Sequence, residues 1–517
     1  MNSTRVFVSR TGKSRSLSLL TVRGPARRLK AAARYRPSHR SLLVDVTAPV
    51  SAESPALQLG CVLLPVSRAF TQSLPGLRLA AELAHDRDCH LVVVYSKRAR
   101  PADFPKELAL ALGDRLVLIN HSRVHLDWKP QLESSRQRLG KFHRKNDAAE
   151  KRNLGLALAS VAGWESVLFL DDDIFSATAE PTLDRVGLGN ALRTLRTRPE
   201  LRAVGWSAKN MDDHSVVGHS RELVRLPQDL FVGAGALLVR CDARTPYFPN
   251  IYNHDWMFLI VLAKKAADPR RAIGWAGTVR QLEYNPYVRG RARSEEAGDI
   301  LGEGLMNLLE DHGTQIDSHS TSEFWDQALL MRRDLVARLQ TKVGRQMLKS
   351  GAKRKAFLAR VLRALTAAEE VNHDLKGADL ARYVGILTRD EESWEGHLTA
   401  LSRAFVNRPG ARQVLVSLQS GKPPTAAWRA VPLPETDSQY SIKAASPAHG
   451  PSPSARLTDS DAQAASDEGV PSRRPRPRWR KGFDVRPRRP VSGSSAPPQF
   501  APEPAGALPQ REVAGIG

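Results

Sequence analysis

Short apolar runs that alternate with helical segments are the feature that most limits the fold of this chain. The runs are rich in Val, Leu and Ile, and residues with helical spacing follow several of them. This alternation predicts a parallel or mostly parallel α/β sheet. The expected strands lie within residues 58–70, 89–97, 114–122, 166–173, 203–210 and 231–241, and the expected helices within 77–86, 146–164 and 254–266.

Composition divides the chain into four parts. Residues 1–55 hold eleven Lys/Arg against two Asp/Glu and lack sustained periodicity, so we expect a disordered basic segment. Residues 56–318 carry the alternating α/β pattern. In residues 319–420 the strand signals vanish, and Leu, Ala, Arg and Glu recur at helical spacing, which predicts an α-helical region. Residues 421–517 are rich in Pro, Ser and Arg and are expected to form a disordered tail.

The formal net charge of +23 is unusual, and the two tails carry more than half of it. Tail charge bears on solubility and on non-specific contact with anionic polymers or membranes, not on the chemistry of the central part. Cys61, Cys89 and Cys241 are far apart and show no metal-ligand spacing, which argues against a disulfide framework or a structural zinc site.

The sequence contains no run of about 18 apolar residues, so we expect no transmembrane helix. The cysteine pattern suits a reducing cytoplasm, so we expect a cytoplasmic protein. Without a recognised nucleic-acid motif, we expect no specific nucleic-acid partner. Its basic tails allow peripheral contact with an anionic membrane or polymer.

Three consecutive carboxylates, Asp171, Asp172 and Asp173, follow an apolar run directly. In open α/β sheets, ligands bind outside the carboxyl ends of the strands, which is where this triplet is expected. Neighbouring strand residues point to opposite faces, so the outer two carboxylates can share a divalent cation. Oxygen ligands favour Mg²⁺ or Mn²⁺, and such a metal leaves positions for phosphate oxygens. The alternative is a solvated acidic turn.

The stretch KRNLGLALASVAGWESVLFLDDDIF (151–175) resembles the central segment of GT-A fold glycosyltransferases, in the broad style of family 2. Members show a basic residue and an Asn, a helix containing GL, and a strand that ends in a DxD-type motif. VLLPVSR (62–68) resembles their first strand and loop. GAGALLVR (233–240), followed by NHDWMF (253–258), resembles their acceptor-side strand and the helix after it.

The likeness spans about residues 57–297. It implies a GT-A, Rossmann-like domain that transfers a sugar from a nucleotide-sugar donor to an acceptor hydroxyl. By this resemblance Asp171 faces the donor sugar or ribose, and Asp173 ligates Mn²⁺ or Mg²⁺, with Asp171 as the other carboxylate of the pair. The role of Asp172 stays open.

The resemblance also implies donor contacts. Arg152 and Asn153 would lie near the nucleotide or its sugar, and the stretch from Pro65 to Arg68 would border the nucleobase. Many members end their second strand in an acidic residue that contacts the nucleoside. Here that strand ends in Tyr-Ser-Lys (95–97), so the identity of the donor stays open.

An inverting transfer needs a general base that takes the proton of the acceptor hydroxyl as it attacks the anomeric carbon. Asp255 is the candidate because it lies at an expected helix N-terminus, where the dipole and the free N–H groups favour a carboxylate. Its alternative role is a helix cap. His254, beside it, is left out of the expected metal set.

A basic stretch, YVRGRARSEEAG (287–298), contains Arg289 and Arg291. Family 2 enzymes carry a basic motif at a comparable distance that closes over the diphosphate leaving group, although the sequence here lacks the usual QxxRW pattern. By location and charge, these arginines would stabilise negative charge on the departing phosphate. The alternative is an exposed basic loop.

Two other functions compete with a metal-dependent, inverting glycosyltransferase. A nucleotidyltransferase-like α/β enzyme usually carries a Gly-rich phosphate loop after its first strand, and residues 65–76 are not Gly-rich. A non-enzymatic polyanion-binding protein would suit the net charge, but the excess charge lies largely in the tails and no recognised nucleic-acid motif is present. The acceptor and the role of residues 319–420 stay open.

Overall fold

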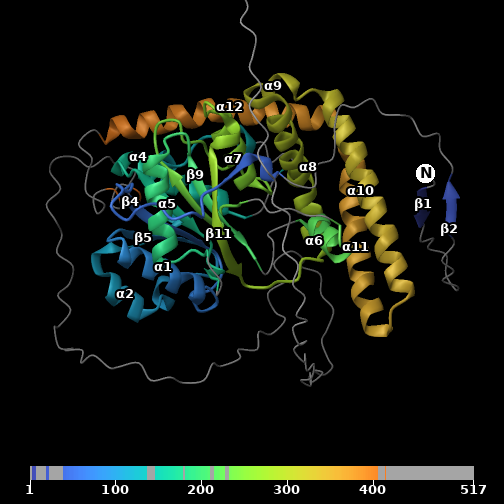
Figure 1. Ribbon diagram of the computed structural model, residues 1–517, viewed down its shortest axis with the longest axis horizontal. Helices are drawn as coiled ribbons and strands as arrows, with labels where there is room; N and C mark the ends of the chain where they lie inside the picture. The colour runs from blue at the N-terminus through green and yellow to red at the C-terminus, as the bar shows by residue number, and fades with distance from the viewer. Residues whose placement is uncertain are drawn as a thin grey trace, which may run out of the picture. The chain divides into compact units, whose positions relative to one another are not determined.

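The computed structural model describes residues 3–6, 19–22, 39–136, 142, 146–177, 181–209, 215–226, 232–405, 414 and 418. Its main feature is a nine-stranded sheet with the order β3-β11-β9-β10-β7-β4-β5-β6, and β8 pairs with β11 (Figure 1). The strands are β3 (Leu43–Asp45), β4 (Leu59–Val66), β5 (His90–Tyr95), β6 (Leu116–Asn120), β7 (Ser166–Leu170), β8 (Ile174–Ser176), β9 (Ala203–Ala208), β10 (Ala236–Arg240) and β11 (Ile273–Gln281).

The sheet is mostly parallel, as the sequence predicts. β4 pairs in parallel with β5 and β7, and β5 with β6. β11 pairs in parallel with β9 and β3, whereas β10 runs antiparallel to its neighbours β7 and β9. The carboxyl ends of β4, β5, β6 and β7 therefore meet at one edge, where a ligand site is expected.

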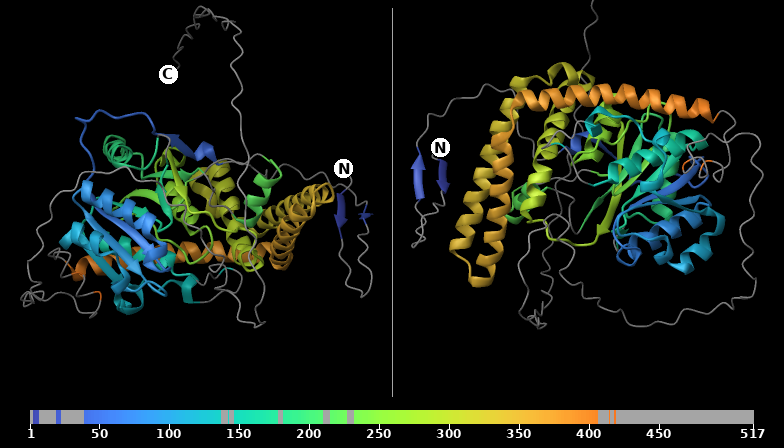
Figure 2. Two further views of the ribbon diagram at one scale, coloured as in Figure 1. Left: turned by 90° about the horizontal axis from the view of Figure 1, so that it is seen from below. Right: turned by 180° about the vertical axis from the view of Figure 1, so that it is seen from behind.

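Helices cover both faces of this sheet (Figures 1 and 2). Side chains alternate between two cores: Leu63 and Phe169 face one, and Leu64 and Leu168 face the other. The helices are α1 (Leu74–Asp86), α2 (Lys106–Leu112), α3 (Glu133–Arg136), α4 (Ala148–Ala162), α5 (Arg185–Thr197), α6 (Val216–Leu223), α7 (His254–Lys264), α8 (Arg289–His312), α9 (Ile316–His319), α10 (Ser322–Leu348), α11 (Ala352–Asp374) and α12 (Gly377–Ala404).

The N-terminal part contains more regular structure than the expected disordered segment 1–55. Strands β1 (Ser3–Val6) and β2 (Leu19–Val22) pair antiparallel, and β3 joins the main sheet beside β11. The apolar stretch around β3 explains this difference, because Leu42 and Val46 are buried in the two cores. The expectation for the rest of this segment, and for the tail 421–517, falls on residues outside the described ones.

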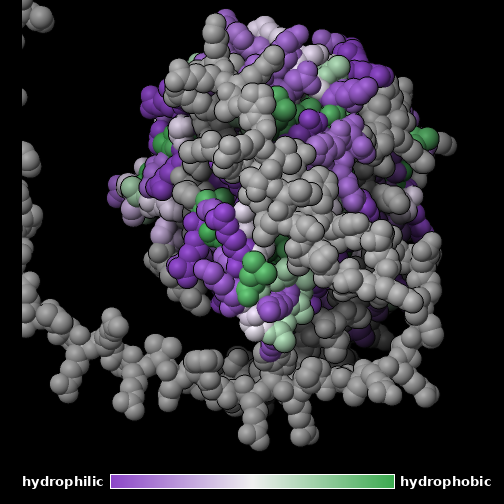
Figure 3. All heavy atoms as spheres, turned by 90° about the vertical axis from the view of Figure 1, so that its right-hand side faces the viewer, coloured by the Kyte–Doolittle hydropathy of each residue, from purple (hydrophilic) through white to green (hydrophobic). Residues whose placement is uncertain are grey.

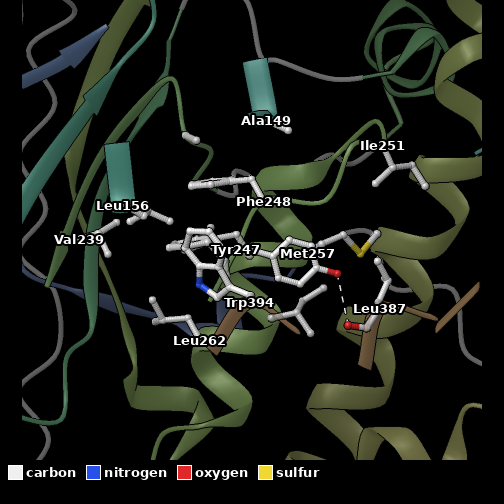
Figure 4. Packing of buried hydrophobic residues seen from close by; sticks show 14 of the residues in the cluster. Ala149, Leu156, Val239, Tyr247, Phe248, Ile251, Met257, Leu262, Leu387 and Trp394 are labelled. Atoms are coloured by element: carbon white, nitrogen blue, oxygen red, sulfur yellow. Dashed lines mark hydrogen bonds between the residues drawn. The ribbon is translucent and has the colours of Figure 1, made fainter. Parts of the chain in front are cut away.

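The C-terminal helices share the core of the sheet. Trp394 of α12 donates from its indole N–H to the carbonyl of Thr245 at 2.9 Å, and the Tyr247 hydroxyl donates to the carbonyl of Leu387 at 3.3 Å. Figure 4 shows Trp394 and Tyr247 packed within the cluster of apolar side chains. The predicted helical region 319–420 is helical over most of its described part, and it braces the α/β domain.

Two elements near the site depart from the expected pattern. β11 was not predicted, because its sequence IGWAGTVRQ mixes small and polar residues. The basic stretch 287–298, for which an exposed loop was the alternative, contributes the start of α8 and is not a loop there. Among the described helices, none is both long and apolar enough to cross a membrane. The three cysteines are free thiols.

Candidate active site

The three carboxylates lie at the carboxyl end of β7, where the sequence predicts them. The backbone N–H of Asp171 donates to the carbonyl of Gly235 at 2.9 Å, at the start of β10. The carbonyl of Asp173 accepts from the N–H of Leu282 at 2.9 Å, just after β11. Two neighbouring connections thus fix the triplet from both ends.

Asp172 points toward α1. Its carboxylate accepts a 2.6 Å hydrogen bond from the hydroxyl of Ser73 and lies 3.3 Å from Nε of Arg68. The residue is only 5% exposed, and burial is the main reason that its pKa is raised, against the opposing effect of Arg68. A Cβ at Gly76 would lie 2.6 Å from the backbone carbonyl of Asp172, so α1 packs directly on this turn. These contacts give Asp172 a structural role.

Asp173 and Arg68 form an ion pair at the same edge. Nη2 of Arg68 lies 3.1 Å from Oδ2 of Asp173, which also accepts from the amide of Gln281 at 3.4 Å. Burial disfavours the charged guanidinium of Arg68, but Asp172, Asp173 and Asp171 together outweigh that effect and raise its pKa. Arg68 therefore offsets the negative charge of the whole triplet. It can do so because it lies just after β4, at the same edge of the sheet as the triplet.

Arg152 holds Asp171 from the other side. Its guanidinium donates to Oδ1 of Asp171 and to Nε2 of His254, and lies 5.7 Å from the ring centroid of Phe248. The other ring nitrogen of His254 lies 3.1 Å from the carbonyl of Ile251, which suits a tautomer that leaves Nε2 to accept from Arg152. In the structure, two arginines offset the repulsion within the triplet.

Asp255 lies beside the same connection. Its Oδ2 accepts from the N–H of Ala234 at 3.1 Å, and its Oδ1 from the N–H of Trp256 at 3.0 Å. The N-cap of α7 is Asn253, with φ of 57°, so Asp255 is a first-turn residue and not the cap itself. A Cβ at Gly233 would lie 2.6 Å from Oδ2 of Asp255. Only glycine leaves room there for this carboxylate.

Asn153 and Pro65 do not have the expected surroundings. The amide of Asn153 donates to the carbonyl of Phe248 at 2.8 Å and accepts from the N–H of Phe248 at 2.7 Å, in a buried position. Asn153 therefore anchors the 248 loop instead of facing a nucleotide. Pro65 is buried within β4, opposite Val94. It lies beyond the last residue that pairs with β7, so its missing N–H costs no hydrogen bond on that side.

A second charged cluster, which sequence reasoning missed, surrounds Asp147. Its carboxylate accepts from the hydroxyls of Ser67 at 3.0 Å and Ser96 at 2.6 Å, and lies 3.2 Å from Nζ of Lys151. Asp147 is the N-cap residue of α4, but its side chain forms no cap hydrogen bond, because it turns to Ser67 and Ser96 at the carboxyl ends of β4 and β5. The resemblance expects an acid at the end of β5, and the sequence has Tyr-Ser-Lys (95–97) there. This gap was the signal that an acid from elsewhere in the chain, here Asp147, could take that place.

The ionisation of this cluster follows from its contacts. Burial opposes the charge of Asp147, but the hydrogen bond from Ser96 and the charges of Lys151 and Lys97 outweigh it and lower its pKa to about 2. Burial lowers the pKa of Lys151 to about 8, against the attraction of Asp147. The Lys151 ammonium donates to the carbonyl of Val66 at 2.8 Å, which ties α4 to the end of β4.

Arg289 and Arg291 lie in the first turn of α8. Arg291 pairs with the buried Glu295, donates to the hydroxyl of Tyr284 at 2.8 Å, and stacks 4.1 Å from the centroid of that ring. Arg289 is exposed. Leu282, whose N–H donates to the carbonyl of Asp173, lies two residues before Tyr284. Only a few residues of chain therefore separate the triplet from the basic first turn of α8.

The residues present suit a cation shared with a substrate, not an all-protein cage. Among the described residues, no group of three or more His, Cys, Asp or Glu is arranged to hold a metal. Mg²⁺, however, is usually held by one or two carboxylates together with substrate phosphates. Asp171 and Asp173, whose side chains are 29% and 12% exposed, offer those oxygens.

The fold and this site define an α/β protein with charged side chains gathered at the carboxyl ends of its parallel strands. No protein-family model matches the chain, and no curated protein matches it. Solved structures do show a likeness.

One similar structure is glucosyl-3-phosphoglycerate synthase from Mycobacterium tuberculosis in complex with phosphoglyceric acid. It has 16% sequence identity and a TM-score of 0.31, and the match covers 48% of this chain and 80% of that chain. Another is a mannosyltransferase from Pyrobaculum calidifontis in complex with GDP-Man and Mn²⁺. It has 14% identity and a TM-score of 0.33, and covers 70% of this chain and 89% of that chain. Identities and TM-scores this low assign no function.

Proposed function

We propose that this chain is a metal-dependent, inverting glycosyltransferase that moves a sugar from a nucleotide-sugar to an acceptor hydroxyl. The observation that carries this proposal is the turn Gly233–Gly235. It donates from the N–H of Ala234 to Asp255 and accepts at the carbonyl of Gly235 from Asp171. The turn thereby holds the backbone of Asp171, the proposed donor-side residue, and the carboxylate of Asp255, the proposed base.

The donor side has groups for both halves of a nucleoside diphosphate. Asp147, with Ser67 and Ser96, supplies an acid at the ends of β4 and β5, where the resemblance expects a nucleoside contact. Arg68 and Arg152 supply positive charge for the diphosphate. Nε of Arg152 is buried and has no hydrogen-bond partner among the described residues, which leaves a donor for a bound anion.

The reaction would proceed by direct displacement. The acceptor oxygen bonds to the anomeric carbon, the bond from that carbon to the phosphate oxygen breaks, and the electron pair leaves with the diphosphate. Asp255 takes the proton of the acceptor hydroxyl. Arg68 and Arg152 stabilise charge that develops on the leaving group, and the exposed Arg289 is placed to approach from α8. Arg291 has a lesser part, because its partner Glu295 is not one of the carboxylates proposed to hold the cation.

Asp171 and Asp173 would hold Mn²⁺ or Mg²⁺. A bound divalent cation would supply positive charge against the diphosphate oxygens. In the structure, Asp171 pairs with Arg152 and Asp173 pairs with Arg68. A bound cation would neutralise the two carboxylates in place of these arginines. Cytoplasmic location and peripheral contact of the tails with an anionic membrane remain part of this proposal.

The test is a thermal-shift screen of nucleoside diphosphates and nucleotide-sugars with and without Mn²⁺, on the wild type, Asp173→Asn and Asp172→Asn. A ligand at about a hundredfold excess over its Kd adds about 2.7 kcal/mol to stability, which is readily detected. We expect Asp173→Asn to lose the Mn²⁺-dependent part of the shift. Asp172→Asn makes the same charge change within the triplet and should keep it, because Asp172 faces Ser73 and α1.

With the donor found, Asp255→Asn should lower kcat steeply and leave donor binding unchanged. A full Mn²⁺-dependent shift in Asp173→Asn would remove the metal assignment. Release of pyrophosphate instead of nucleoside diphosphate would identify a nucleotidyltransferase, and a chain with no response to any nucleotide would refute the proposal.

A further inference from the structure

Outside the site, the most unusual surface is the helical hairpin formed by α10 and α11. Residues 335–368, which we call the basic hairpin, contain nine Lys or Arg and no Asp or Glu. All nine are exposed: Arg338, Lys342, Arg345, Lys349, Lys353, Arg354, Lys355, Arg360 and Arg363. The rest of residues 56–420 holds as many acidic as basic side chains. The charge excess of the central part therefore lies in this one hairpin.

The basic hairpin is a built element. Its two helices pack through buried apolar residues, including Val343, Leu358 and Val361, and its base packs on α6 and α8. Figures 1 and 2 show α10 and α11 side by side, reaching away from the sheet. Figure 3 views this side of the molecule and shows hydrophilic side chains with small apolar groups among them.

The apex combines charge with apolar surface. Leu348, the last residue of α10, is 66% exposed and precedes Lys349. Across the turn, the ring of Phe357 is half-buried, and the guanidinium groups of Arg354 and Arg360 lie 4.9 and 5.8 Å from its centroid. An exposed apolar side chain with the exposed Arg345 and Lys349 close to it in the sequence suits the headgroup layer of a membrane, where the apolar group inserts and the cations meet phosphates.

We propose that the basic hairpin binds the surface of an anionic lipid bilayer. Nucleic acid is the competing polyanion, but a phosphate backbone gives no use for an exposed Leu at the apex. The hairpin also contacts the segment between β11 and α8, because the ring of Phe357 meets that of Tyr287 edge-on at 5.5 Å. Tyr287 lies five residues after Leu282, which is bonded to Asp173.

The test is co-sedimentation of the full chain with vesicles. One set contains equal parts of phosphatidylcholine and phosphatidylglycerol, and the other contains phosphatidylcholine alone. The hairpin variant carries Arg345→Glu, Lys349→Glu and Lys355→Glu. Each Lys or Arg near an anionic surface contributes about fivefold to partitioning, so we expect at least about a hundredfold loss. These side chains are exposed, and the unfolding temperature should not change.

A matched control carries Lys106→Glu, Arg123→Glu and Arg244→Glu, three exposed residues on other elements. It makes the same change in net charge and keeps both tails, so we expect binding within about twofold of the wild type. Leu348→Ser should weaken the binding that remains at high salt, because that part is apolar.

Several outcomes would overturn the proposal. Equal binding to both vesicle sets, or an equal loss in the control variant, would assign the effect to overall charge or to the tails. Loss of duplex DNA binding with unchanged vesicle binding in the hairpin variant would identify a nucleic-acid surface. Nucleotide thermal shifts, measured on the same variants, report separately on the glycosyltransferase proposal.

Discussion

Arg332 is the buried cation between α8 and α10, and its replacement by Leu is a stringent test of the structure. It is 3% exposed and binds Glu296 with two hydrogen bonds, of 2.8 and 2.9 Å. It also lies 3.3 Å from Glu303 and pairs with Asp299. Arg332→Leu would leave the buried Glu296 and Asp299, and the partly buried Glu303, without their cation.

The expected cost follows from that geometry. Removal of one partner from a buried ion pair costs about 3–5 kcal/mol, and here three acids share one arginine, so we expect about 4 kcal/mol or more. A typical domain has about 5–15 kcal/mol of stability, so the variant should fold with a much lower urea midpoint. Tryptophan fluorescence reports this transition, because Trp325 of α10 is buried.

The dependence on pH gives the sharper test. Burial is the main cause that raises the pKa of Glu296 and Glu303 above the ordinary 4.5, and Arg332 opposes it. Without Arg332 those pKa values rise further. An acid whose pKa is raised by folding adds stability below its unfolded pKa, and that stability is lost as pH rises through the folded value. The deficit of the variant should therefore be largest near neutral pH and shrink toward the ordinary pKa of 4.5.

Arg333 is the matched control. It is the next residue on α10 and donates to the carbonyl and the side-chain oxygen of Asn372, at 3.0 and 3.3 Å. Because no carboxylate depends on it in these contacts, Arg333→Leu should cost about 1 kcal/mol, with little change over the same pH range. Equal losses in the two variants, or an Arg332→Leu deficit that does not vary with pH, would refute the buried charge cluster.

Two further predictions concern the site. Gly233→Ala would place a Cβ 2.6 Å from Oδ2 of Asp255, so we expect kcat to fall at least tenfold, about 1.4 kcal/mol, while nucleotide thermal shifts persist; unchanged turnover would contradict the role of this turn. Asp147→Asn should weaken nucleoside diphosphate binding in the thermal-shift assay. Folding lowers the pKa of Asp147 from 3.8 to about 2, so its charge stabilises the fold above pH 3.8, and this stabilisation is lost as pH falls through 2. The deficit of Asp147→Asn in unfolding free energy should therefore shrink over that pH range.

Much of the fold could be predicted because the signals are local. A strand that is buried on both faces needs no alternation of apolar and polar residues, and the continuous apolar runs of β4, β5 and β7 predict such strands directly. β11 gives no such signal. Its residues IGWAGTVRQ include two glycines and several polar groups, and its place beside β9 and β3 depends on pairing with distant segments.

The site divides along the same line. The triplet could be placed at a strand end because its position follows from neighbouring residues. The partners of Asp147 could not, because Ser67 and Ser96 lie 80 and 51 residues away along the chain. Locally, an Asp before a helix predicts a cap, and tertiary contacts turned the side chain elsewhere. Similarly, the sequence around Asn153 predicts a ligand contact, but its side-chain amide forms two hydrogen bonds with the backbone of Phe248.

The arginine pairs of the triplet link the two ligands that the proposed function requires. Arg152 and Arg68 offset the charge of Asp171 and Asp173 in the structure. The same guanidinium groups would bind the diphosphate when the donor is present. A cation on the carboxylates would replace that balancing charge and leave the arginines available to the anion. Metal and nucleotide should then each raise the affinity for the other, because the coupling between two ligands is reciprocal.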